Sequence, residues 1–147
     1  MKKFIYLFAM VAMGLSSCSK DAATITIDSS KPDGSFTVSK SGIFVKDGPP
    51  SAGMVQLGKD SKGVQFLKFG SDFTTEFGTG TVSVYLSTTM VFVPDPGNSK
   101  GNLRLIGPAL KAGETYFKLD PAADSKFTYV ILWCGTANIQ FANAKLN

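Results

Sequence analysis

Short strand-like segments, separated by turns rich in Gly and Pro, recur along the whole chain after residue 18. No segment there shows a helical period of ten or more residues. Spacing of about 8–12 residues between such segments is typical of an all-β sandwich. The segments are residues 41–45, 52–57, 64–69, 81–86, 103–106, 115–119, 127–134 and 137–141. We therefore predict an antiparallel β-sandwich of about 8–10 short strands, after an N-terminal signal helix.

Two further segments are weaker candidates for regular structure. Residues 90–93 would continue as a strand, and the Pro/Gly-rich stretch that follows ends it. Residues 120–124 would form one helical turn with Pro121 at its first position.

The strongest strand signal is the segment 127–134, which holds the only tryptophan of the chain. Side chains alternate along a strand, so the segment has two faces. One face carries Phe127, Tyr129, Ile131 and Trp133, and the other carries Thr128, Val130, Leu132 and Cys134. Both faces are mainly apolar, which predicts a central strand covered on both sides. Gly135 is expected to end the strand and to let the backbone turn.

The N-terminus has the pattern of an export signal. Lys2 and Lys3 precede an apolar run over residues 4–15, which is too short to span a bilayer. The run ends in Leu15-Ser16-Ser17-Cys18, which resembles the lipobox of bacterial lipoproteins. An ordinary secretory signal that happens to contain a cysteine is the alternative.

The resemblance to lipoproteins implies three parts of the chain. They are a signal peptide over 1–17, a lipidated tether and first strand over 18–40, and a sandwich domain over 41–147. Cys18 would carry acyl chains such as palmitate, which anchor a protein without a spanning helix. Ser19 in place of Asp favours the outer membrane, facing either the periplasm or the cell surface.

Charge and composition exclude several classes of function. The formal charge is +4, and removal of Lys2 and Lys3 lowers it to +2. The remaining lysines are scattered, so we expect no nucleic-acid binding. The chain has no histidine, which excludes Ser-His and Cys-His catalysis, histidine metal sites and histidine-ligated haem.

No catalytic set emerges from the remaining residues. The carboxylates are few and dispersed, so a glycosidase pair has no support, and we expect no enzyme beyond a redox accessory domain. Asp95 and Asn98 lie in a Pro/Gly segment where a calcium site is conceivable, but these residue types more often form plain turns.

Cys134 is the main candidate for chemistry. With Cys18 lipidated, it has no partner for an intrachain disulfide. The alternatives are an inert buried thiol, a redox thiol, a ligand to a prosthetic group and an intermolecular partner. The residues alone favour an inert core thiol. Trp133, Tyr85 and Tyr116 are possible neighbours of a site, although each is also an ordinary core or rim residue type.

Several segments, taken in order, resemble the DM-thirteen domain of Skeletor-type proteins, which often lies beside cytochrome-like DOMON domains. They are Ser41-Gly42-Ile43-Phe44, Ala52-Gly53-Met54-Val55-Gln56-Leu57, Phe66-Leu67-Lys68-Phe69 with Phe73, Val82-Ser83-Val84-Tyr85-Leu86-Ser87, Leu110-Lys111-Ala112-Gly113-Glu114-Thr115-Tyr116, and Tyr129-Val130-Ile131-Leu132-Trp133-Cys134 with Phe141 and Ala144-Lys145-Leu146. Together they cover residues 41–146. The chain departs from the family pattern at Gly78-Thr79-Gly80, where an acidic residue is missing.

The resemblance implies a role in electron transfer or oxidative modification at cell surfaces. Cys134 occupies the position of the family's cysteine, which is proposed to act as a bare thiol or as a haem ligand. A second haem ligand would be Met54, Met90, a tyrosine, a lysine or water. The leading hypothesis is a membrane-anchored redox domain that exchanges electrons with a partner protein. The alternative is a non-catalytic surface binding or assembly module in which Cys134 is core packing.

Overall fold

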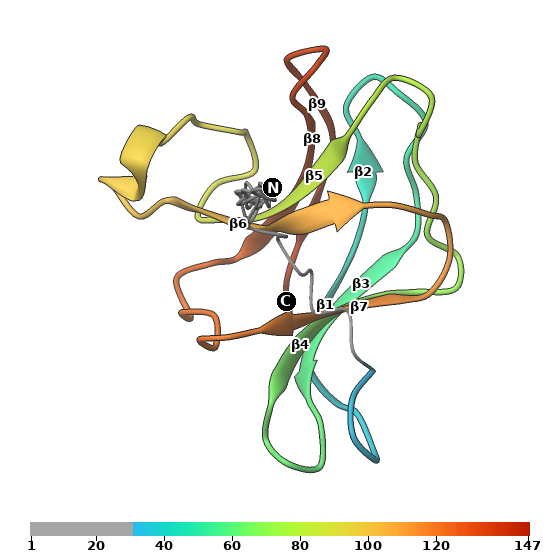
Figure 1. Cartoon of the computed structure of the whole chain (residues 1–147), viewed down its shortest axis with the longest axis vertical. Helices are drawn as coiled ribbons and strands as arrows, with labels where there is room; N and C mark the ends of the chain where they lie inside the picture. Colours follow the sequence, from blue (N-terminus) through green and yellow to red (C-terminus); the bar gives the residue numbers. More distant parts are fainter. Residues whose placement is uncertain (1–30) are drawn as a thin grey trace, which may run out of the picture.

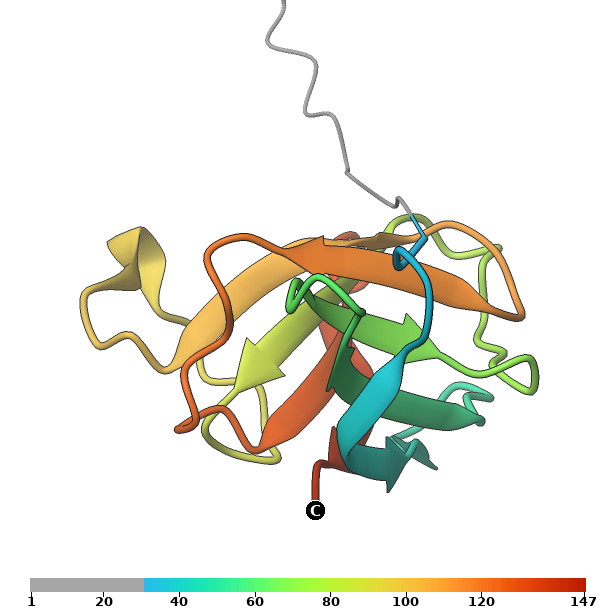
Figure 2. The same cartoon turned by 90° about the horizontal axis from the view of Figure 1, so that it is seen from below.

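Two antiparallel β-sheets pack face to face in a computed structural model that describes residues 31–147 (Figures 1 and 2). The first sheet has the order β1 (Thr37–Ile43), β3 (Met54–Lys59), β4 (Gln65–Phe69) and β7 (Thr115–Leu119). The second has the order β2 (Val45–Lys46), β9 (Ile139–Lys145), β8 (Tyr129–Cys134), β5 (Val82–Ser87) and β6 (Leu103–Ala109). The predicted all-β sandwich is confirmed.

Alternation of apolar and polar residues decides which side of each strand faces the core. In β5, Val82, Val84 and Leu86 are buried, and Ser83 and Tyr85 between them are half-buried. Strand β3 pairs with β4 in antiparallel register, so the two form a hairpin.

Aromatic side chains fill one part of the space between the sheets. Phe44, Phe69 and Phe73 contact one another, with ring centroids 4.3–5.6 Å apart. Each is at most 4% exposed, and burial of such a side chain contributes about 1.5–3 kcal/mol. The loop between β4 and β5 supplies Phe73 to the core, and the partly buried Phe77 packs against it.

Strand β8 lies between β9 and β5, so its predicted central position is confirmed. Val130, Leu132 and Cys134 have no exposed surface and belong to the core. On the other face only Ile131 is fully buried, and Tyr129 and Trp133 are half-buried. The predicted cover on both sides is therefore complete on the core face and only partial on the other, where the loop that carries Phe92 covers part of the strand.

The turn after β8 also differs from expectation. The strand ends at Cys134, directly before Gly135, as predicted. Gly135 does not adopt a positive φ, and the left-handed position in this turn belongs to Asn138, with φ of 54°. Asparagine adopts this conformation more readily than most other non-glycine residue types.

Two expected elements are absent from the described residues. Residues 90–93 form no strand, because the Phe92 amide donates to the Gln140 side chain instead of to a neighbouring strand. Residues 120–124 form no helical turn, and the Ala123 amide donates to the Gln65 side chain. The only helix in residues 31–147 is the 3-10 turn η1 (Pro96–Asn98).

The chain passes from the first sheet to the second between β1 and β2. Ser41 and Asn147 exchange two backbone hydrogen bonds of 3.0 Å, which join β1 to the end of the chain. The Lys145 carbonyl lies where a Cβ atom on Gly42 would stand, so this close approach requires glycine. This seam closes one side of the sandwich, and β6 and β7 are the edge strands at the other ends of the two sheets.

The expected domain boundary at residue 41 falls within β1, which begins at Thr37. The predicted signal peptide and the predicted lipidation of Cys18 lie outside the described residues. Within residues 31–147, no helix has the length and apolar character needed to cross a membrane.

Candidate functional site

Cys134 is enclosed in the core between the two sheets. Its side chain has no exposed surface, and it is a free cysteine. The sulfur contacts one loop residue, Thr79, with Sγ 3.8 Å from the carbonyl oxygen and 4.0 Å from Oγ1. Gly78 and Gly80 flank Thr79. In this loop the chain lacks the acidic residue of the DM-thirteen pattern that it otherwise resembles. The surroundings are those of a small core side chain with one weak polar contact.

These surroundings do not fit a haem group. An iron porphyrin beside Cys134 would displace core side chains, because the thiol has no free surface. Met54 and Met90, the candidate second ligands, are 40% and 55% exposed, whereas the thiol is enclosed. Within the described residues no cluster of three or more Cys, Asp or Glu side chains suits a metal ion.

Trp133 and Tyr85 lie on the opposite face of the same sheet, away from the core. Residues directly opposite in an antiparallel sheet share a face. Trp133 stands between Gln140 of β9 and Ser83 of β5. Tyr85 stands between Ile131 of β8 and Leu105 of β6. We call this side of the second sheet the outer face.

A loop between β5 and β6, residues 88–102, returns to the outer face and places Phe92 on it. The Phe92 ring stacks on Trp133, with centroids 4.0 Å apart and planes inclined by 14°. It also meets Tyr85 edge to face, at 5.1 Å and 71°. Offset-stacked and edge-to-face pairs of this kind add attraction beyond area burial. The three rings form an aromatic cluster across β5, β8 and the loop.

Gln140 fixes this loop to the sheet. Its Oε1 accepts a hydrogen bond of 2.7 Å from the Phe92 amide, and its Nε2 donates to the Met90 carbonyl at 3.0 Å. Nε2 also donates to Asp47 Oδ2 at 3.2 Å, and the residue is buried. A buried amide with three partners is well satisfied and holds the Phe92 backbone in one place.

A groove of about 460 Å³ lies between the loop and the edge of the sheet and opens to solvent. Its lining includes Tyr85, Phe92, Pro94, Asp95, Asn98 and Leu105. The volume is within the range of small-molecule sites, about 300–1,000 Å³. Loop η1 forms one wall and projects from the sandwich in both views (Figures 1 and 2).

Two charged residues, Asp95 and Arg104, line the groove. The Asp95 carboxylate accepts hydrogen bonds from the amides of Lys100 and Asn102, at 3.0 and 3.3 Å, and from the Ser99 hydroxyl at 3.3 Å. The Lys100 amide contributes most to a pKa of Asp95 below its usual value. Arg104 is half-buried, and its side chain makes no hydrogen bond or ion pair within residues 31–147.

The Asp95 contacts are those of a turn. The carboxylate is taken up by its own loop, and the Asn98 amide side chain makes no hydrogen bond within residues 31–147. The arrangement agrees with the interpretation of Asp95 and Asn98 as turn formers.

Tyr116 lies in β7 of the other sheet, apart from Trp133 and Tyr85. Its ring meets Phe36 and Phe66 edge to face, at 5.9 and 6.4 Å. Lys68 Nζ lies 5.3 Å from the Tyr116 ring centroid and 3.1 Å from Glu114 Oε2. A hydrogen bond to Tyr116 is the main reason that the pKa of Lys68 is raised. This cluster covers the first sheet and leaves Tyr116 outside the aromatic cluster of Phe92.

A second groove, of about 470 Å³, lies at the seam between the sheets. The exposed apolar side chains of Ile43, Val45 and Met54 line it, together with Lys145 and Asn143.

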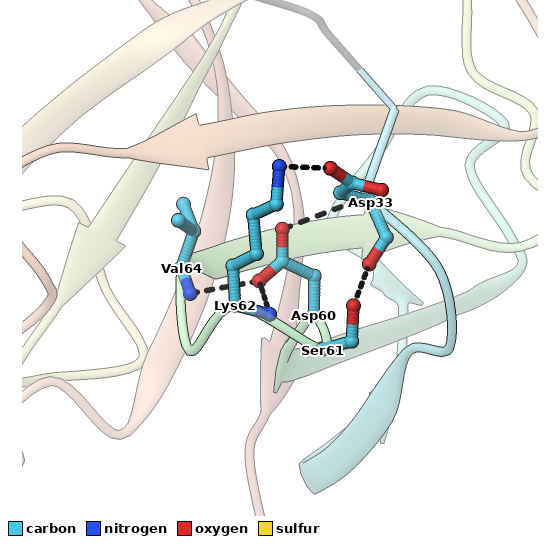
Figure 3. Close-up of polar contacts among 5 residues, drawn as sticks. All are labelled: Asp33, Asp60, Ser61, Lys62 and Val64. Atoms are coloured by element: carbon cyan, nitrogen blue, oxygen red, sulfur yellow. Dashed lines mark hydrogen bonds and ion pairs between the residues drawn. The ribbon is translucent and has the colours of Figure 1, made fainter.

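A polar cluster at the β3–β4 turn holds the first described residues (Figure 3). The buried Asp60 carboxylate accepts hydrogen bonds from the amides of Asp33, Lys62 and Val64, at 2.9–3.2 Å. Ser61 donates its hydroxyl to the Asp33 carbonyl, and Lys62 pairs with the Asp33 carboxylate. Burial acts to raise the pKa of Asp60, but the three amides outweigh it and the pKa is lowered. The cluster is structural.

No protein-family model, curated protein or solved structure matches the chain. Sequence reasoning missed Phe92 and Gln140, the two residues that build the aromatic cluster. The strong break at residues 94–98 indicated a loop, but no local pattern shows that a loop folds back onto a sheet.

Proposed function

We propose that the chain is a non-catalytic binding module whose ligand site is the groove on the outer face. The contrast between the groove and the surroundings of Cys134 supports this proposal. The groove is open, preformed and lined with aromatic rings, whereas Cys134, the main candidate for chemistry, is sealed in the core. Ligand sites are concave, largely preformed, and lined by apolar and aromatic groups with a few polar ones.

Rigidity of the groove supports this proposal. Phe92 is held by Trp133 on its ring and by Gln140 at its backbone. A site whose side chains are already ordered loses less conformational entropy on binding. Both supports come from strands in the centre of the sheet, which are the stable part of the fold.

We further propose that the module is tethered by a lipidated Cys18 in the cell envelope, at the outer membrane. The lipobox-like segment is the support for this. The domain would then present its groove to macromolecules of the periplasm or of the cell surface.

The second candidate is the electron-transfer role that the DM-thirteen resemblance implies. Its specific support is that a single loop residue, Thr79, makes the polar contacts to Cys134 Sγ. Movement of the loop between Gly78 and Gly80 would bring the thiol to the surface, where a redox partner protein could reach it.

Chemical-shift mapping tests the binding proposal. Isotope-labelled protein would be titrated with polysaccharide and protein fractions of the cell envelope, and amide shifts would be assigned. The proposal expects a saturable response at residues 85, 92–98 and 103–105. A saturable response confined to residues 78–80 and 134 would favour the redox role instead. No response from any fraction at the groove would contradict the binding proposal.

A further inference from the structure

We infer that the groove on the outer face takes an organic monocarboxylate with an apolar body, and that the carboxylate of this ligand pairs with Arg104. This inference rests on the proposed function and names the ligand class of the same site. It follows from an unpaired cation in the groove, from the state of the one acidic residue that shares the groove, and from the apolar lining.

Arg104 is the only arginine of the chain, and it lines the groove from the edge strand β6. The residue is half-buried, and its guanidinium makes no hydrogen bond or ion pair within residues 31–147. A charged group that loses part of its hydration without gaining a partner costs free energy. A bound anion would supply the partner, and the planar guanidinium matches a carboxylate through two parallel hydrogen bonds.

Asp95 is the acidic residue of the groove, and its own loop occupies its carboxylate. The amides of Lys100 and Asn102 and the hydroxyl of Ser99 donate to it, at 3.0–3.3 Å. Within the described residues no ion pair joins it to Arg104, so the guanidinium is left for a ligand. The negative charge of Asp95 still opposes a second negative charge in the groove. A ligand with one carboxylate therefore fits better than a phosphate, which carries about −1.5 to −2 charges at pH 7.

Most of the other lining residues are apolar. The rings of Phe92 and Tyr85 meet at 71° and form a corner, and Pro94 and Leu105 line the groove with them. Leu105 is 59% exposed, so much of this apolar surface is in contact with water. Removal of apolar surface from water favours binding in proportion to the area. The ligand is therefore expected to carry an aromatic ring or an alkyl chain beside its carboxylate.

Matched pairs of carboxylates and amides test the inference. Isotope-labelled protein would be titrated with phenylpropanoate and with octanoate, each beside its primary amide, which has a similar shape and no charge. Phenyl phosphate is the probe with a higher negative charge. We expect saturable shifts at the amides of residues 92–98 and 103–105. At least one carboxylate should bind about tenfold or more tightly than its amide, because hydrogen bonds between charged groups are the stronger ones. Phenyl phosphate should bind more weakly than that carboxylate.

Variants locate the carboxylate at Arg104. Arg104→Gln should weaken binding of the carboxylate by about tenfold and leave the affinity for the amide unchanged. Arg104→Lys keeps the charge but not the planar fork, so its affinity should lie between the two. Phe92→Ala should weaken binding of the same carboxylate by about three- to tenfold, because an aromatic contact with the ligand body is lost. Lys46→Gln is the control, since it removes an exposed positive charge from β2, at the opposite edge of the same sheet.

The outcomes distinguish the ligand class from the proposed function. Equal affinity of the wild type for carboxylate and amide would overturn the pairing with Arg104 and leave a binding module. Tighter binding of phenyl phosphate than of either carboxylate would overturn the monocarboxylate class. Carboxylate binding that Arg104→Gln does not alter would overturn the site. If no probe binds while envelope fractions still shift the groove amides, the inference alone is overturned. If neither probes nor fractions shift them, the proposed function is contradicted as well.

Discussion

Single side chains decide where this domain is open and where it is sealed. Cys134 has no exposed surface, although its neighbour in sequence, Trp133, faces outward. The alternation of β8 alone separates the thiol from the aromatic cluster. Tyr85 and Trp133 therefore lie on the outer face, whereas Cys134 lies in the core between the sheets.

Asp60→Asn should lower the melting temperature by several degrees, because an amide accepts hydrogen bonds less strongly than a carboxylate and one of its ends only donates. Thermal unfolding followed by circular dichroism measures the change. Asp124→Asn is the control, because that carboxylate accepts from one local amide only, Lys126.

The difference in stability between wild type and Asp60→Asn should shrink as the pH falls. The pKa of Asp60 is lower in the folded protein than its unfolded value of about 3.9. Its contribution to stability is therefore present above pH of about 4 and is lost as pH falls through the folded pKa. Wild type and Asp60→Asn should converge in stability at low pH. A constant difference down to pH 2 would show that the carboxylate charge is not the cause.

The sequence predicted the strands of the sandwich well and the path of its loops poorly. Alternation along β5 and the apolar run of β8 identified these strands, because burial between two sheets selects such patterns. The same rules failed at residues 90–93. There the Phe92 amide donates a hydrogen bond to the side chain of Gln140, 48 residues further along the chain. Contacts over such distances leave no local pattern, so the groove was not predictable.

The seam between the sheets depends on one glycine. Gly42→Ala should reduce the free energy of unfolding by about 1–3 kcal/mol, because its methyl group would overlap the Lys145 carbonyl. Gly135→Ala is the matched control: nothing lies near its added Cβ, and its φ is not positive. Denaturant unfolding of both variants measures this. Equal loss of stability in the two would contradict the role of the seam.

The loop 88–102 should loosen when Gln140 is removed. Gln140→Ala deletes the bonds to Phe92, Met90 and Asp47, and should cost about 1–3 kcal/mol of stability. Quenching of Trp133 fluorescence by acrylamide should rise, because Phe92 would no longer be held on its ring. Asn143→Ala, also in β9 and without a side-chain hydrogen bond in residues 31–147, is the control. Unchanged quenching in Gln140→Ala would show that the aromatic stack holds without this support.

Residues 31–147 form a small sandwich with a closed seam on one side and a groove on its outer face. A tether from Cys18 would hold it at a membrane and leave the groove free. Cys18→Ser should abolish labelling with radioactive palmitate and release the protein from the membrane fraction, because each buried methylene contributes about 0.8 kcal/mol of membrane affinity. Labelling that persists in this variant would contradict the proposed anchor.

We propose that Cys134 is core packing and that the protein acts through its outer face. The most direct measurement is the rate at which an aromatic disulfide reagent modifies the Cys18→Ser protein, in which Cys134 is the only cysteine. We predict no appreciable reaction with the native protein and one equivalent of reaction after unfolding in denaturant. Rapid stoichiometric modification under native conditions would contradict the claim and favour a redox role for Cys134.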